Sequence, residues 1–129
     1  SNADVSILAI GSNTLLASAP LASENYRPKI GENVVQIGCP HGETPPRNMP
    51  CAVTAVNKFS GFQNISCSGR PAQGRSGGGL FNARGEVIGI CSADAFEEGG
   101  LYPSFQELRT MLKEKTNFGY KLLEGSGSR

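Results

Sequence analysis

A serine set among glycines, directly before an apolar segment, most constrains what this chain can fold into. The run is Gly74-Arg75-Ser76-Gly77-Gly78-Gly79-Leu80. The glycine that begins it lets the backbone turn tightly, so that the amides of Gly74, Arg75 and Ser76 can converge on one carbonyl oxygen. The later glycines let a substrate approach without meeting a Cβ atom. A flexible linker would be longer and have polar flanks, so the run favours a serine nucleophile just before a strand.

The residues on both sides of this run resemble the nucleophile region of trypsin-like serine proteases, most closely the bacterial HtrA/Deg branch. The resemblance covers residues 71–78 and 80–90, and residues 29–42 resemble the family segment that contains the first strand of the second barrel. It implies an all-β fold: a chymotrypsin-like second β-barrel of six short antiparallel strands in a Greek key, followed by a C-terminal α-helix. It also implies peptide-bond hydrolysis by a Ser-His-Asp triad with an oxyanion hole.

The resemblance assigns two catalytic positions in this chain. Ser76 is the nucleophile, and Asp4, which heads the apolar segment 4–10, looks like the carboxylate that orients the triad histidine. The only histidine, His41, follows Asp4, whereas the family's catalytic histidine precedes its aspartate, so we interpret His41 as a loop residue near the rim of the active site. We therefore expect the general base to lie in a first barrel upstream, and negligible peptidase activity from the chain alone.

Composition and turn signals fit one compact domain. With 129 residues, 17 glycines and 8 prolines, the chain can bury one modest core and must turn often, as a barrel of short strands requires. Ser1-Asn2-Ala3 is typical of a remnant of tag cleavage. We expect residues 4–10 to be the last strand of the missing first barrel, 11–32 the connection between barrels, 33–118 the second barrel with its helix, and 119–129 a tail.

Apolar periodicity predicts the positions of the strands and of one helix. The helix is expected over residues 103–115, where apolar residues recur at helical spacing for packing on the core. Its stripe is Phe105, Leu108, Met111 and Leu112. Strands are expected over residues 4–10, 33–38, 51–59, 63–67, 79–82 and 86–91, with a hairpin turn at 82–85.

The resemblance also indicates where a peptide substrate binds. Arg70 lies six residues before the nucleophile, where trypsin carries its pocket aspartate, which argues against cleavage after Lys or Arg and favours acidic residues. Ser92-Ala93-Asp94 lies where the family's main-chain edge pairs with an extended peptide. Arg75 stands where the family usually has Asp or Asn, so activation through a salt bridge to a new N-terminus is not expected.

Four cysteines in a small, turn-rich domain indicate an oxidising compartment, so we expect a periplasmic or secreted protein; a cytoplasmic protein with four buried thiols is the alternative. If the strands that carry them form a hairpin, Cys51 and Cys67 lie within bridging distance, and Cys39 is left to pair with Cys91. A zinc site built from His41 and three of these cysteines is disfavoured, because the chain has no Cys-x-x-Cys pair. We therefore expect no metal ligands.

Charge and hydropathy exclude other classes of function. The net charge of +1 gives no basic field for nucleic acid, and no apolar run reaches the roughly 18 to 20 residues that a membrane span needs. We expect no cofactor; the expected partners are a peptide or protein substrate and the missing N-terminal barrel. Two alternatives to a peptidase stay open: a catalytically dead barrel that binds peptides or proteins, and a structural module that forms homo-oligomers through its exposed barrel face.

Overall fold

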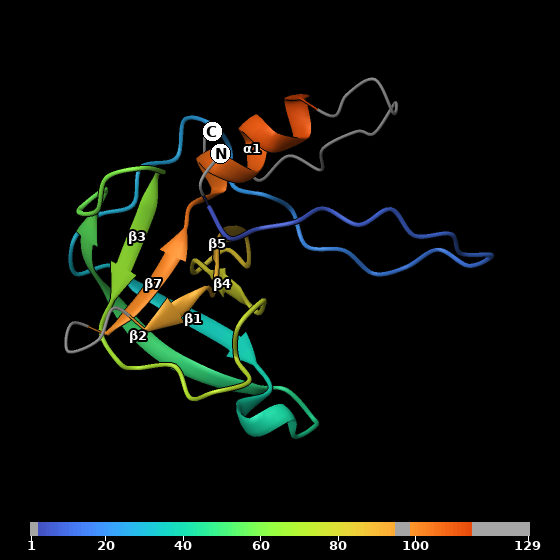
Figure 1. The fold of residues 1–129 in the computed structure, drawn as a ribbon, viewed down its shortest axis with the longest axis horizontal. Coiled ribbons are helices and arrows are strands. Elements are labelled where there is room, and N and C mark those ends of the chain that lie inside the picture. The colour runs from blue at the N-terminus through green and yellow to red at the C-terminus, as the bar shows by residue number, and fades with distance from the viewer. Residues whose placement is uncertain (1–2, 95–98, 115–129) are drawn as a thin grey trace.

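Seven short strands and one α-helix make up most of the regular structure of residues 3–94 and 99–114, the part of the chain that the computed structural model describes (Figure 1). The strands are β1 (Asn33–Gly38), β2 (Arg47–Val56), β3 (Asn64–Cys67), β4 (Gly79–Phe81), β5 (Val87–Ile90), β6 (Ala93–Asp94) and β7 (Gly100–Pro103). The helices are the short 3-10 helix η1 (Pro40–Gly42) and α1 (Phe105–Glu114).

The strands form one antiparallel sheet in the order β5-β4-β1-β2-β3-β7-β6. β1, β2 and β3 follow one another, and β4 returns to lie beside β1, which is the arrangement of a Greek key. An antiparallel bridge between Gly89 in β5 and Ser104 after β7 joins the two sides of the sheet and closes the barrel. The predicted all-β barrel with a C-terminal helix is confirmed, with seven strands instead of six.

β1 has the predicted bounds, whereas β2 begins earlier than expected, at Arg47, and ends at Val56. Among the described residues, the part of β2 before Ala52 pairs with no strand other than β1, so Pro50 lies on a stretch with an open side, where a missing amide costs nothing. The strand ends where Asn57 adopts a φ of 55°.

β6 lies within the predicted substrate edge Ser92-Ala93-Asp94, whereas β7 was not among the predicted strands. β6 is only two residues long, and in β7 a glycine and a proline flank two apolar residues, a composition typical of a turn. β7 becomes a strand because it pairs with β3 on one side and with β6 on the other. The predicted hairpin after β4 is confirmed: Gly85 has a φ of 76° and its amide donates to the carbonyl of Asn82.

The predicted strand over residues 4–10 is wrong. Residues 3–19 form no strand, and Figure 1 shows them as an extended blue arm that leads away from the barrel. Leu8, Ile10 and Leu15 are 82%, 74% and 102% exposed. A strand needs a hydrogen-bonded neighbour, and within the described residues this segment has none until Leu21 bridges Val87 of β5. Residues of high β propensity form strands only in such a context.

α1 packs against β5 and the segment before β1. Phe105 is fully buried, and its ring meets that of Tyr26 edge-on with centroids 5.5 Å apart. Leu108 and Leu112 pack against the same core, as the predicted stripe requires. Arg109, only 6% exposed, donates two hydrogen bonds to the carbonyl of Ala22, at 2.9 and 2.7 Å. No helix among the described residues is long and apolar enough to cross a membrane. Lys115, the expected last residue of the helix, and the predicted tail over residues 119–129 lie outside the described residues.

Candidate active site

The predicted nucleophile lies at the exposed tip of the loop between β3 and β4. The hydroxyl of Ser76 donates a hydrogen bond to the carbonyl of Ser92, at 3.0 Å. Two backbone hydrogen bonds hold the loop here: the amide of Gly77 donates to the carbonyl of Cys91, at 2.7 Å, and the amide of Cys91 donates to the carbonyl of Gly78, at 2.8 Å. Ser76 is therefore fixed beside the segment that follows β5.

Gly74 determines how the loop enters the site. Its φ is +96°, and a Cβ atom there would lie 2.7 Å from the carbonyl oxygen of Cys39 and from the amides of His41 and Gly42. The amide of His41 also donates to the carbonyl of Gln73. The turn of residues 38–42, which contains η1, thus lies against the nucleophile loop and permits only glycine at position 74.

The structure distinguishes the three amides that were predicted to form an oxyanion hole. The amide of Arg75 already donates to the carbonyl of Ala72, at 3.2 Å, so it is not open to a substrate in this conformation. Nothing in residues 3–94 and 99–114 accepts a hydrogen bond from the amides of Gly74 and Ser76. These two amides are the loop's remaining donors for a developing oxyanion.

Arg75 contributes through its side chain, which the sequence did not reveal. The side chain points into the barrel and is only 6% exposed; one guanidinium nitrogen donates to Oε1 of Gln36 and to the carbonyl of Arg47. Gln36 is fully buried, and its Nε2 donates to the carbonyl of Ile37, at 3.0 Å. The residue directly before Ser76 is thereby anchored to β1 and β2.

A sequence signal for this anchor exists in hindsight. Gln36 follows the buried Val34 by two positions on β1, so both side chains point to the interior of the barrel. A buried amide needs hydrogen-bond partners. Gly78 makes room for it, because a Cβ atom at that position would lie 2.6 Å from Nε2 of Gln36 and 2.2 Å from the carbonyl oxygen of Ile37.

A groove of about 860 Å³ contains both predicted catalytic residues. Ser76 and Ser92 line it from the barrel, Asp4 lines it from the N-terminal arm, and α1 contributes apolar side chains. Asp4 and Ser76 are both exposed. His41 and Arg70 are exposed too, but neither is among the described residues that line this groove, and the pocket role of Arg70 stays a prediction.

The predicted substrate edge lies next to the groove. The amide of Ser92 donates to the carbonyl of Leu101, and Ala93 and Asp94 continue as β6, paired with β7. β6 is the last strand of the sheet, so within residues 3–94 and 99–114 no strand pairs with its other side. An extended peptide can pair with such an edge through main-chain hydrogen bonds.

The cysteines are free thiols in the structure, so neither predicted disulfide is formed, and the predicted periplasmic or secreted location stays a prediction. The two thiols Cys51 and Cys67 nevertheless affect each other, because their interaction lowers the pKa of Cys51 and raises that of Cys67. Cys91 is buried, and burial raises the pKa of its thiol to about 11, partly opposed by the charge of Arg75. Among the described residues, no three His, Cys, Asp or Glu side chains are grouped as a metal site.

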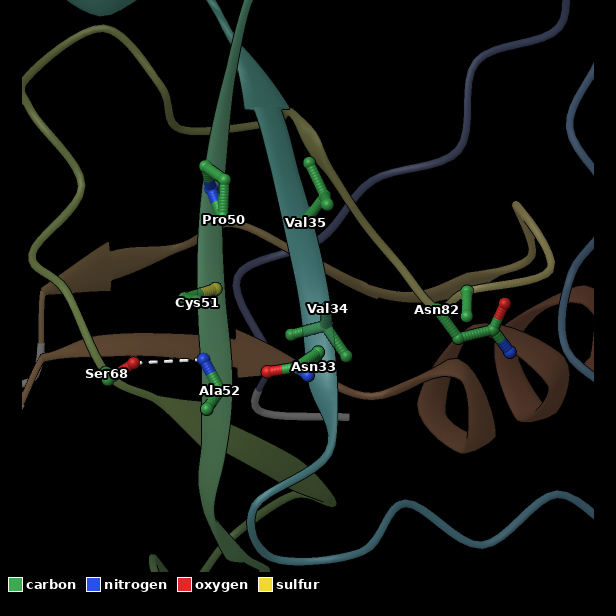
Figure 2. Close-up of a pocket in the computed structure, with 9 residues that line it drawn as sticks. Asn33, Val34, Val35, Pro50, Cys51, Ala52, Ser68 and Asn82 are labelled. Atoms are coloured by element: carbon green, nitrogen blue, oxygen red, sulfur yellow. Dashed lines mark hydrogen bonds between the residues drawn. The ribbon is translucent and has the colours of Figure 1, made fainter.

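A second hollow lies along β1 and β2 (Figure 2). Its volume is about 470 Å³, and Val34, Cys51 and Asn82 are among the residues that line it. It contains neither Ser76 nor Asp4 and is therefore separate from the candidate active site.

Comparison with known proteins identifies the family. The model of the trypsin-like peptidase domain matches residues 1–90. The chain belongs to the trypsin-like peptidase family. The matched region contains β1 to β5 and the whole nucleophile loop, so the family assignment and the geometry around Ser76 concern the same part of this trypsin-like peptidase chain. No curated protein matches the chain by sequence.

Solved protease structures share the fold of this trypsin-like peptidase domain. The active form of the Rv3671c protease from M. tuberculosis has a TM-score of 0.67 and 24% identity, over 85% of this chain and 52% of that chain. The inactive form of the Rv3671c protease gives 0.66 and 24%, over 74% and 53%. The serine endoprotease from Yersinia pestis gives 0.62 and 27%, over 75% and 34%. The predicted likeness to HtrA-like serine proteases is confirmed. This chain spans about half the length of the two Rv3671c protease chains and about a third of the length of the Yersinia pestis chain.

Proposed function

We propose that this chain supplies the serine-bearing barrel of a serine endopeptidase, with Ser76 as the nucleophile. The observation that carries the proposal is the position of Ser76. It lies exposed at the tip of a loop that is held at both ends, and the amides of Gly74 and Ser76 are without acceptors within the described residues. The groove in which it lies is also lined by Asp4.

The proposed reaction is acyl transfer to Ser76. Its Oγ attacks the scissile carbonyl carbon while an imidazole takes the hydroxyl proton, and the amides of Gly74 and Ser76 stabilise the oxyanion, each worth about 3 kcal/mol. The C–N bond then breaks, the imidazolium gives its proton to the leaving amine, and water releases the acyl group by the same steps. In the structure the hydroxyl donates to Ser92 instead; a histidine entering the groove would replace that carbonyl as acceptor.

The general base in this proposal is a histidine outside the chain. His41 is excluded because it belongs to η1 and does not line the groove. Asp4 is assigned the role of accepting the hydrogen bond from the far nitrogen of that imidazole, which fixes its tautomer. The chain alone, with 1 histidine, is accordingly proposed to be inactive.

The substrate is proposed to bind as an extended peptide along Ser92, Ala93 and Asp94. β6, which has a single strand neighbour in the described part of the chain, comes directly after the residue that contacts Ser76, so a peptide added at its other side would have its scissile bond near the nucleophile. The role of Arg70 in substrate selection stays a prediction from the sequence.

A catalytically dead barrel that binds peptides is the second candidate. The observation that favours it is the hydrogen bond from Ser76 to the Ser92 carbonyl, which occupies the hydroxyl with a group that cannot act as a base. The edge of β6 would serve such a binding module equally well.

Labelling with a fluorophosphonate tests the proposal. The probe is applied to this chain and to the longest form of the protein that its gene encodes, each with a Ser76→Ala variant. We expect labelling of the longer form, lost on Ser76→Ala, and no labelling of this chain alone. Labelling of neither form would favour the binding module, and labelling of the short chain would contradict the assignment of the base to a separate segment.

A further inference from the structure

Cys51 and Cys67 are neighbours on paired strands. Cys67 pairs with Val53, which is two residues after Cys51 on β2, so both cysteines point to the same face of the sheet. The strands are pinned between them, because the amide of Ala52 donates to Oγ of Ser68, at 2.9 Å, and the amide of Ser68 donates to the carbonyl of Ala52, at 2.8 Å. The two cysteines are therefore held near each other by the barrel itself.

The two cysteines differ in exposure. Cys67 is 0% exposed, whereas Cys51 is 9% exposed and lines the hollow between β1 and β2. Figure 2 shows its sulfur among the side chains of that hollow, with Val34 and Val35 on the neighbouring strand. A small thiol reagent would meet Cys51 first.

The hydrogen bonds at the pair make Cys51 the better nucleophile. The thiol of Cys67 and the backbone amide of Gln36 both donate to the sulfur of Cys51 and lower its pKa, against the effect of burial. The same thiol–thiol bond and burial raise the pKa of Cys67. Since the thiolate is the form that attacks, the accessible sulfur is also the reactive one.

We propose that Cys51 and Cys67 form a thiol–disulfide exchange site for low-molecular-weight disulfides, with Cys51 as the attacking thiol and Cys67 as the resolving thiol. The Cys51 thiolate bonds to one sulfur of a disulfide such as oxidised glutathione, whose S–S bond breaks and releases one glutathione thiolate. Cys67 gives up its proton and attacks the Cys51 sulfur, which releases the second glutathione. The two protein thiols are oxidised to one disulfide, and one glutathione disulfide is reduced to two thiols. This site is independent of peptidase activity.

The test is carried out on the chain with Cys39→Ser, because Cys39 is partly exposed and its side chain has no part in the site. The protein is reduced, freed of reductant, incubated with oxidised glutathione, and analysed by intact mass and by peptide mapping without reduction. We expect the loss of two hydrogens, no lasting glutathione adduct, and a bridge between Cys51 and Cys67.

Variants assign the two roles. With Cys67→Ser the adduct should remain on Cys51, because the resolving thiol is gone, and with Cys51→Ser the chain should take up no glutathione. Cys91→Ser is the matched control and should still form the bridge. A bridge to Cys91, an unreactive Cys51, or uptake by the Cys51→Ser variant would overturn the proposal. If a variant fails to fold, as judged by circular dichroism, the peptide map of the Cys39→Ser chain alone decides the question.

Discussion

The buried contact between Arg75 and Gln36 is the structural feature whose removal is most informative. Gln36→Leu removes the acceptor of one charge-assisted hydrogen bond, worth about 1.5–3 kcal/mol, and the bond from Nε2 to Ile37, worth about 0.5–1.5 kcal/mol. Arg75 is 6% exposed, so water cannot replace the lost partner. The free energy of unfolding should fall by about 2–4 kcal/mol, a large part of the roughly 5–15 kcal/mol typical of a domain.

Arg75→Met should lower the free energy of unfolding by less than Gln36→Leu does. It leaves Oε1 of Gln36 without its donor, at about 1–3 kcal/mol, but it also removes a buried charge whose desolvation is expensive. In the double variant two apolar side chains face each other and neither leaves an unpaired polar group behind. Its loss of stability should therefore be smaller than the sum of the two single losses by about 1–3 kcal/mol.

Urea unfolding followed by circular dichroism measures these values, with the slope checked for constancy. The matched control is Gln63→Leu, since Gln63 is exposed, and a change within about 0.5 kcal/mol is expected there. Hydrogen exchange provides a second measurement: Gln36→Leu should accelerate exchange of the Gly77 amide, in the loop, more than that of Val53, in β2. Additive single losses, or a stable Gln36→Leu variant, would refute the idea that this contact anchors the loop.

Three further predictions concern other parts of the barrel. Gly74→Ala should lower the free energy of unfolding by at least about 1–3 kcal/mol more than Gly31→Ala does. Both glycines have positive φ, but only at Gly74 would the added Cβ lie 2.7 Å from backbone atoms. Equal losses of stability in urea unfolding would contradict this packing argument. Burial raises the pKa of Cys91 to about 11 from the usual 9, so as the pH rises the unfolded chain loses this proton before the folded chain does. The free energy of unfolding should therefore fall by roughly 1–2 kcal/mol between pH 9 and 11. Cys91→Ala should show a shallower fall, and the same dependence on pH in the variant would argue against a buried Cys91 thiol as the cause. Arg109→Leu should cost about 1.5–3 kcal/mol, since its charged hydrogen bonds to Ala22 are buried, while Lys113→Ala, on the exposed side of α1, should cost little; thermal unfolding of the two variants compares them, and similar melting temperatures would contradict the prediction.

Local patterns predicted much of the barrel because its strands follow the rules that a sequence displays. β1 alternates in burial, the turn at Gly85 has the expected residues, and α1 has its apolar stripe. The prediction failed where a neighbour decides the conformation. Residues 4–10 have strand-like composition but no adjacent strand, whereas β7 has turn-like composition and two adjacent strands.

The features of the candidate site also differ in whether local sequence could predict them. Ser76 could be predicted because the glycines around it are contiguous in sequence. The contact between Arg75 and Gln36 joins residues 39 positions apart, and nothing local to either residue indicates the other. The same holds for the turn of η1 against Gly74. Such contacts follow from the register of β1 against β2 and β4, which is a property of the assembled sheet.

The position of the Arg75 side chain bears on how the loop acquires its shape. The resemblance to trypsin-like proteases implied that an aspartate before the serine would hold the loop by a salt bridge to a new N-terminus, which an arginine cannot make. Here the anchor consists of Gln36 and the carbonyl of Arg47, both within the barrel. Because none of these groups depends on a chain terminus, folding of the barrel is sufficient to order the loop around Ser76. Cleavage of the chain is therefore not needed to form the anchor, and the variants of Gln36 and Arg75 test that conclusion directly.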